Sequence, residues 1–182
     1  MMRKAILVLA AMLLIYSCSS DDTYTTYSRY KANFSYSKVM TAAPLKNALT
    51  GPGEFCTITF GTSTLIFKSL TSSHSDPITA STMYYQSFRC MSMDGFIVGM
   101  PNQLEMNADE LKIVCYDVVC SNCYHDIPIH SILTLQENGF AFCKRCKRNY
   151  NLNNLGMSSE GDRPLERYHI SYDGANYMAV WN

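Results

Sequence analysis

The sequence predicts an all-β protein, and three observations support this fold class. Apolar and polar residues alternate over many short stretches, turn-forming residues recur between these stretches, and helix signals are scarce. Many short strands separated by regular turns are typical of a β-sandwich or a barrel-like domain. The segment at residues 44–49 favours a helix and is long enough for one short helical turn.

The expected strands follow one another from residue 32 to the C-terminus. The first alternating run consists of Ala32, Phe34 and Tyr36. The second, which follows a Gly-Pro-Gly turn signal, consists of Cys56, Ile58 and Phe60. Further strands are expected at residues 65–67, 88–91, 96–98, 113–119, 132–135, 140–142, 168–172 and 178–180. The dipeptides that mark turns between neighbouring strands are Asp94-Gly95, Asn138-Gly139 and Asp173-Gly174.

The N-terminus has the features of an export signal. Arg3 and Lys4 precede an apolar stretch, residues 5–16, that is too short to span a bilayer as a stable helix. The stretch ends in Ile15-Tyr16-Ser17-Cys18, which resembles the lipobox of bacterial lipoproteins. We therefore expect residues 1–17 to be a signal peptide and Cys18 to carry a diacylglycerol and palmitate anchor. An ordinary signal peptide with an incidental cysteine is the alternative.

The residues after Cys18 predict a tether and a location. Residues 18–31 are rich in Ser, Thr, Asp and Tyr and offer no apolar face, so they are expected to form a flexible tether. The run Ser19-Ser20-Asp21-Asp22 resembles the surface-export signal of Bacteroidetes lipoproteins. This favours an outer-membrane lipoprotein exposed at the cell surface over one on the periplasmic face.

Size and charge limit what the mature chain can be. Removing 17 of the 182 residues leaves 165, which is the size of one domain, expected at residues 32–182. Removing Arg3 and Lys4 from the 15 basic residues leaves 13 against 15 acidic ones, a net charge of −2. Nothing in this balance indicates a nucleic-acid partner. The expected partners are the membrane, through the lipid on Cys18, and an unidentified protein or glycan.

The strongest chemical signal is a pair of Cys-x-x-Cys knuckles. Cys120 and Cys123 form the first, Cys143 and Cys146 form the second, and 19 residues separate them. A two-residue gap lets a tight turn point both sulfurs inward, and two such turns supply the corners of a tetrahedron around a soft cation. The sequence therefore predicts a metal site with these four ligands.

Disulfides are the alternative, because an exported chain enters a compartment in which thiols can oxidise. Either knuckle could close on itself, or the two could be cross-linked. The remaining cysteines are Cys56, Cys90 and Cys115. Cys56 and Cys115 lie in strand patterns and are expected to be small buried apolar residues, while a disulfide between Cys56 and Cys90 stays open.

The region from Tyr116 to the C-terminus resembles the Rieske iron–sulfur domain. The second knuckle stands where that family has Cys-x-x-His, and Tyr150-Asn151-Leu152 falls where Phe-Asp-Leu is expected. Pro164-Leu165 precedes Tyr168-His169-Ile170 as the family's Pro-Leu precedes its penultimate strand. The resemblance implies a Rieske-like β-sandwich with a separate metal subdomain, at about residues 116–152.

The departures from the family decide which metal is expected. Both ligand histidines are absent from the expected places, the first loop has gained a residue, and Lys147 replaces a glycine. Two Cys-x-x-Cys knuckles instead favour a single tetrahedral ion, as in zinc ribbons and rubredoxin. Zinc is the expected ion, and an all-cysteine [2Fe–2S] cluster or a single iron is the alternative.

Other chemical features are weaker. His125 and His130 flank the first knuckle, and we expect hydrogen-bonded surface roles for them in preference to metal ligation. A basic loop surrounds the second knuckle and could offset thiolate charge or meet anionic groups; it consists of Lys144, Arg145, Lys147 and Arg148.

The chain has no Ser-His-Asp order, paired catalytic carboxylates or phosphate loop, and four thiolates leave zinc no open position. We therefore expect no catalysis but a binding or assembly module. Electron transfer is the first alternative, and a thiol–disulfide redox enzyme is the second.

Overall fold

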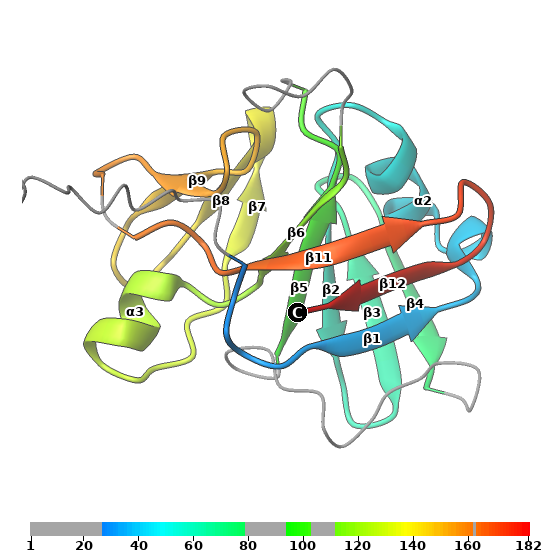
Figure 1. Ribbon diagram of the computed structural model, residues 1–182, viewed down its shortest axis with the longest axis horizontal. Coiled ribbons are helices and arrows are strands. Elements are labelled where there is room, and N and C mark those ends of the chain that lie inside the picture. Colours follow the sequence, from blue (N-terminus) through cyan, green and yellow to red (C-terminus); the bar gives the residue numbers. More distant parts are fainter. Residues whose placement is uncertain (1–26, 79–93, 103–111, 162) are drawn as a thin grey trace, which may run out of the picture.

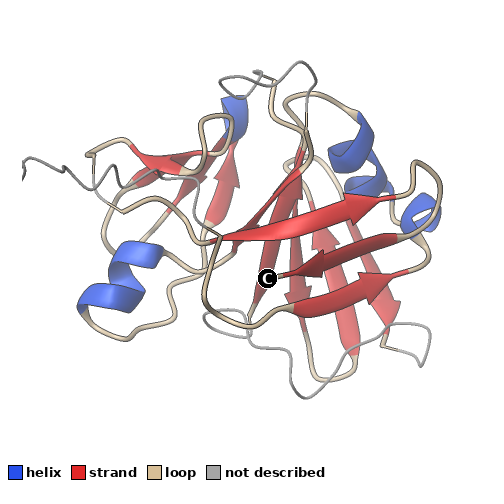
Figure 2. Ribbon diagram, in the orientation of Figure 1, coloured by secondary structure: helices blue, strands red, loops and turns tan. Residues whose placement is uncertain are grey.

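The computed structural model describes residues 27–78, 94–102, 112–161 and 163–182, and this part of the chain is mostly β (Figures 1 and 2). Its twelve strands form two antiparallel sheets, with only two short α-helices. The all-β prediction is confirmed, and the four knuckle cysteines form one cluster. Cys18, the expected signal peptide and Cys90 lie outside the described residues.

The larger sheet has eight strands. In spatial order they are β1 (Asn33–Tyr36), β12 (Met178–Trp181), β11 (Arg167–Tyr172), β6 (Val114–Asp117), β5 (Gly95–Gly99), β2 (Phe55–Phe60), β3 (Thr64–Lys68) and β4 (Ser73–Pro77). The smaller sheet has four, in the order β10 (Met157–Ser158), β9 (Asn149–Asn151), β8 (Phe140–Phe142) and β7 (Thr134–Gln136). The helical elements are η1 (Val39–Thr41), α2 (Ala43–Thr50), α3 (Ser121–Asp126) and η2 (Glu137–Gly139).

The large sheet curls so that its two edge strands meet. Tyr36 Oη on β1 donates a hydrogen bond of 2.8 Å to Asp76 Oδ2 on β4, and Lys38 Nζ lies 3.6 Å from the same oxygen. Helix α2 packs against this sheet and buries Leu45 and Leu49. The curl therefore encloses an apolar core, which includes Phe34, Ile58, Phe67, Phe96 and Tyr168.

Strands β5 and β6 separate two apolar cores. Every residue of both strands is buried. Phe96, Val98 and Cys115 face the core inside the curled sheet. Ile97 and Tyr116 face a second core, which they share with the small sheet and the knuckles. Because successive side chains on a strand point to opposite faces, these two strands fix the small sheet and the knuckles to the body of the protein.

Figure 1 shows α3 and strands β7–β9 on one side of the large sheet and α2 on the other. The hairpin of β7 and β8 turns where the sequence predicts it, with Asn138 at φ 60 and Gly139 at φ 72. Asn and Gly are the residues that adopt this left-handed region most readily. The predicted hairpin of β11 and β12 also forms, with Ile170 opposite Val180.

Several elements differ from the expectation. The sequence predicted little helix beyond residues 44–49, yet α3 forms within the first knuckle, and β4, β9 and β10 were not predicted. Strand β4 consists of polar residues and Pro77, so its pairing with β3 depends on backbone hydrogen bonds and not on an apolar face. The strand expected at residues 88–91 lies outside the described residues, and both edges of β5 are occupied by β2 and β6.

Contacts with the domain begin within the segment that was expected to be tether. Tyr27 stacks on His169 with ring centroids 3.4 Å apart, and the backbone N–H of Ser28 donates to the carbonyl of Arg167 at 2.7 Å. Tyr30 packs edge-on against Tyr124. The aromatic rings of this segment thus gain apolar contacts that its overall polarity did not indicate. Across the described ranges, no helix is long and apolar enough to cross a membrane.

Candidate metal centre

The structure brings the four knuckle cysteines together. Their Sγ atoms all lie within 4.8 Å of one another, and the residues are Cys120, Cys123, Cys143 and Cys146. The first three are buried, whereas Cys146 is half-buried. A set of four converging sulfurs at the boundary between two sheets can hold a metal ion.

The first knuckle is built on a helix. Cys120 is the residue before α3, with φ −63 and ψ 114, and Cys123 lies in the first turn of α3. The backbone N–H of Tyr124 donates to the carbonyl of Cys120 at 3.1 Å. The buried Ser121 accepts a hydrogen bond from the backbone N–H of Glu166 at 3.2 Å, which fixes α3 to the chain that leads into β11.

The second knuckle is a tight turn between β8 and β9. The backbone N–H of Cys143 donates to the carbonyl of Arg148, and the N–H of Lys147 donates to the carbonyl of Cys143, both at 2.9 Å. Lys147 closes the turn at φ 64, a conformation that favours glycine over residues with a Cβ atom. This is the position at which the sequence has lysine in place of the glycine of the Rieske pattern.

The distances between sulfurs fit one small cation. Cys120 Sγ lies 3.5 Å from Cys146 Sγ, and Cys123 Sγ lies 3.6 Å from Cys143 Sγ, so both short distances join the two knuckles. Bonds of about 2.3 Å from a zinc ion to four sulfurs at tetrahedral angles place neighbouring sulfurs about 3.8 Å apart. All four cysteines are free thiols in the structure. The geometry needs little change to accept a tetrahedral ion.

Hydroxyl groups contact two of the sulfurs. Tyr150 Oη lies 3.1 Å from Cys120 Sγ and accepts a hydrogen bond of 2.8 Å from Asn122 Nδ2. Ser131 Oγ lies 3.2 Å from Cys143 Sγ. Groups outside the ligand set that hydrogen-bond a ligand orient it and tune its affinity for the metal.

The knuckle thiols ionise differently. Burial raises the pKa of Cys120, and burial together with the neighbouring Cys143 raises the pKa of Cys123 to about 11. Burial also acts to raise the pKa of Cys143. Hydrogen bonds from Ser131 and from the backbone N–H groups of Cys146 and Arg145 outweigh that effect and lower the pKa of Cys143 to about 6. Of these three thiols, Cys143 is therefore the one that is most readily available as a thiolate.

The flanking histidines have other partners. His125 Nε2 lies 3.3 Å from Glu166 Oε1, and His130 Nδ1 lies 3.1 Å from Asp94 Oδ2. Both histidines are exposed, and neither belongs to the group of four sulfurs. The preference for surface hydrogen bonding over metal ligation agrees with these contacts.

The basic loop around the second knuckle is largely solvated. Lys144, Arg145 and Lys147 are exposed, while the half-buried Arg148 places its Nε 3.4 Å from Glu160 Oε2. Of the other cysteines, Cys56 and Cys115 are buried outside the cluster, as expected, and burial raises the pKa of Cys56 to about 12. The question of a Cys56–Cys90 disulfide involves a residue outside the described part of the chain.

Sequence reasoning did not assign a role at the site to Ser131, Asn122 or Tyr150. The sequence indicates Tyr150 only through the resemblance to the Rieske family. Its position shortly after the second knuckle is the signal that could have identified it, because a buried tyrosine needs a hydrogen-bond partner for its hydroxyl. Ser131 gives no such signal, because its contact with Cys143 depends on the isolated bridge between Val119 and Ile132.

No protein-family model, curated protein or solved structure matches this chain.

Proposed function

We propose that this chain is an exported lipoprotein, anchored by lipid on Cys18, whose four-cysteine site binds one structural zinc ion. The ion braces the small sheet, and the domain serves the cell as a binding or assembly module at the outer membrane, on the outer face. The observation that carries the metal assignment is the convergence of four sulfurs within 4.8 Å at the boundary of two sheets.

The distances support a single ion over a [2Fe–2S] cluster. In an all-cysteine cluster each iron takes two thiolates, and the bridging sulfides hold the two irons, and so the two thiolate pairs, apart. Here all four sulfurs lie within 4.8 Å of one another, so no two thiolate pairs are held apart. The site also lacks the two imidazoles that a Rieske centre uses.

A structural role is supported by what the site connects. Strands β7–β10 have only two or three residues each, so their own backbone hydrogen bonds hold them weakly. Three of the four cysteines belong to the second apolar core. An ion there would join α3, which follows β6 of the large sheet, to the β8–β9 turn. Four protein ligands leave zinc no open position for catalysis.

Metal removal tests the bracing role. Zinc binding contributes about 10–16 kcal/mol to the folding of zinc-finger peptides, so a strong chelator should lower the melting temperature markedly. Cys143→Ser should have the same effect. Cys56→Ala, which removes a buried thiol outside the cluster, is the matched control and should lower the melting temperature much less. Equal loss in the two variants, with no effect of chelator, would contradict a structural metal.

The lipid anchor has its own test. The sequence around Cys18 supports modification of that thiol, so Cys18→Ser should abolish labelling of the protein by radioactive palmitate and its retention in the membrane fraction. A Cys18→Ser protein that is still processed, labelled and retained would contradict the anchor.

Electron transfer is the second candidate, because four thiolates also bind iron well and the order of loops resembles that of the Rieske family. In that case the site would carry a single iron or a cluster and pass electrons to a partner. Iron and sulfide analysis separates this candidate from a structural zinc ion.

A further inference from the structure

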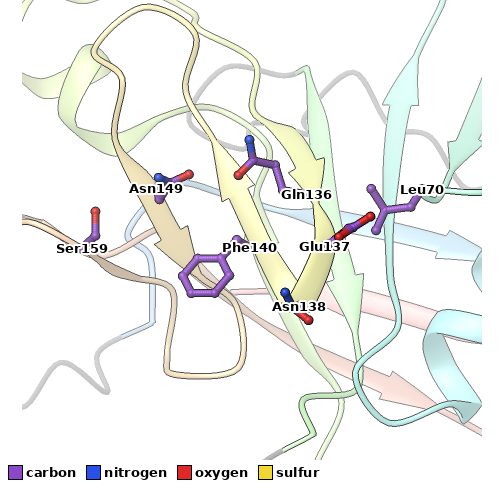
Figure 3. Close-up of a pocket in the computed structure, with 7 residues that line it drawn as sticks. All are labelled: Leu70, Gln136, Glu137, Asn138, Phe140, Asn149 and Ser159. Carbon is purple, nitrogen blue, oxygen red and sulfur yellow. The ribbon is translucent and has the colours of Figure 1, made fainter.

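The outer face of the small sheet lines an open cavity of about 640 Å³. Residues Gln136 on β7, Phe140 on β8 and Asn149 on β9 contribute to it, so the cavity spans three adjacent strands. Ala141 is buried beneath the sheet and Phe140 is half-buried, as the alternation of side chains along a strand requires. Figure 3 shows the Phe140 ring with Asn149 and Ser159 on one side and Asn138 and Glu137 on the other.

The lining combines one aromatic ring with a set of neutral polar groups. Side-chain amides both donate and accept hydrogen bonds, as the hydroxyl groups of a sugar also do. The face of an aromatic ring packs against the C–H face of a pyranose. Phe140 is half-buried and lines the cavity, so part of its ring is available to a ligand. A ring between amides is therefore a lining that suits a sugar unit.

One polar atom of this wall has no partner within the protein. Asn149 Oδ1 is buried and accepts no hydrogen bond from the part of the chain that the structure describes. An unpaired buried acceptor is destabilising, so it is seldom left without a donor. A rotation of the amide that brings Oδ1 to the cavity surface would let a hydroxyl group of a ligand supply that donor.

The charge of the lining favours a neutral ligand. Among the described residues that line the cavity, Glu137 is the only charged one. An anionic ligand would find no cation to offset its desolvation. The nearby Arg148 does not line the cavity and lies 3.4 Å from Glu160.

The cavity continues as a groove toward the large sheet. A second cavity of about 300 Å³ shares Leu70, Gln136, Glu137 and Asn138 with the first and extends to Phe55. Leu70, which is 55% exposed, lines both cavities and is an apolar residue where they meet. An open groove that spans both sheets suits a chain of several sugar units better than a single small molecule.

From these observations we infer that the outer face of the small sheet is a glycan-binding site for a neutral oligosaccharide, centred on Phe140 and Asn149. This inference rests on the proposed function, since Cys143 and Cys146 lie in the turn between β8 and β9. The metal would hold in register the two strands that carry Phe140 and Asn149. The domain would then be a glycan-binding module of the cell envelope.

The test uses the metal-loaded mature protein in mild detergent, with the metal content and melting temperature of each preparation measured first. Titration calorimetry measures its affinity for the neutral probes cellohexaose, xylohexaose and mannohexaose, and for the anionic probe hexagalacturonate. We expect at least one neutral probe to bind, and at least tenfold more tightly than hexagalacturonate.

Substitutions of residues that line the cavity test whether the sugar binds to the outer face of the small sheet. Phe140→Ala and Asn149→Leu should each weaken binding of the neutral probe at least tenfold, and Gln136→Ala should weaken it severalfold. Gln136 is exposed on an edge strand, so its replacement leaves the fold intact even if Phe140→Ala does not. The control is Trp181→Ala, which removes a 41% exposed ring from the large sheet and should leave the affinity unchanged.

Three results would overturn the glycan assignment while leaving the metal assignment intact. They are a metal-loaded protein that binds none of the neutral probes, a preference for hexagalacturonate, and unchanged binding in folded Phe140→Ala and Gln136→Ala variants. A wild-type protein that contains no metal and is unaffected by chelator would instead overturn the proposed structural metal, whatever its affinity for sugars.

Discussion

The hydroxyl of Tyr150 lies 3.1 Å from Cys120 Sγ, in the buried space between the first knuckle and β9. Asn122 Nδ2 donates to the same hydroxyl at 2.8 Å, so the phenolic O–H is directed at the sulfur. Burial and the hydrogen bond to Cys120 raise the pKa of Tyr150, which keeps the hydroxyl a donor at every physiological pH. This contact joins the small sheet to the opposite knuckle.

Tyr150→Phe should therefore weaken metal binding without removing a ligand. Loss of a hydrogen bond to a ligand typically lowers metal affinity about 10–100-fold. The control is Tyr116→Phe, because Tyr116 is also buried and donates to the carbonyl of Leu152 at 3.2 Å, away from the sulfurs. Competition with a chromophoric chelator measures both. Equal affinities of the two variants would show that the Tyr150 hydroxyl does not support the site.

Replacing Lys147 tests whether its left-handed backbone conformation strains the second knuckle. Its φ of 64 costs a residue with a Cβ atom about 1–2 kcal/mol, whereas the flexibility of glycine in the unfolded chain costs about 0.5–1 kcal/mol. Lys147→Gly should thus raise the free energy of unfolding by up to about 1 kcal/mol. Lys144→Gly, at an exposed position of ordinary φ in the same turn, should lower it by about 0.5–1 kcal/mol. Denaturant unfolding with saturating metal distinguishes the two; a Lys147→Gly variant less stable than Lys144→Gly would contradict the strain.

Metal uptake should depend steeply on pH. At pH 7–8, Cys143, with a pKa of about 6, is already a thiolate, whereas Cys123, with a pKa of about 11, and Cys120 hold protons. Binding as four thiolates must release at least two protons, so the affinity should rise at least about 100-fold per pH unit between pH 7 and 8. Below pH 6 the further proton on Cys143 makes the loss steeper. Calorimetry in buffers of different ionisation enthalpy counts the protons; release of fewer than two would contradict ligation by all four.

The contact between Tyr36 and Asp76 should stabilise the curl of the large sheet. A hydrogen bond to a charged group contributes about 1.5–3 kcal/mol, so Tyr36→Phe should lower the free energy of unfolding by about that amount at pH 7. Tyr172→Phe, which removes an exposed hydrogen bond to the carbonyl of Ala175, should have a smaller effect.

The same contact predicts a pH dependence. Burial acts to raise the pKa of Asp76, but Tyr36, Lys38 and His74 together lower it below its usual value. A lowered carboxyl pKa adds stability that is complete above the unfolded pKa and is lost as the pH falls through the folded one. The difference between wild type and Tyr36→Phe should therefore shrink in acid. A difference that is constant from pH 7 to pH 2.5 would contradict this role of Asp76.

The sequence predicted the parts of the fold that leave a local pattern. The alternation at Cys56 and Ile58, the Asn138-Gly139 turn and the spacing of the knuckles each depend on residues close together in the chain, and each appears in the structure. The polar strand β4 and helix α3 leave no such pattern. Strand β4 pairs through its backbone, and α3 is a six-residue helix with little apolar periodicity.

Contacts between segments far apart in the chain could not be predicted from the sequence. Tyr36 and Asp76 meet only because eight strands curl, and Ser131 reaches Cys143 only through the approach of two loops. The groove on the outer face of the small sheet depends on the register of β7, β8 and β9, which places Gln136, Phe140 and Asn149 together. The lipid anchor on Cys18 and the resemblance to the Rieske family remain predictions.

Metal and sulfide analysis of the mature protein, purified without oxygen, tests the central claim most directly. We predict a colourless protein with about one zinc ion per chain and no acid-labile sulfide, because four sulfurs within 4.8 Å suit one tetrahedral ion. A visible absorbance band from sulfur-to-iron charge transfer, with iron and acid-labile sulfide in stoichiometric amounts, would contradict the structural zinc site and favour electron transfer.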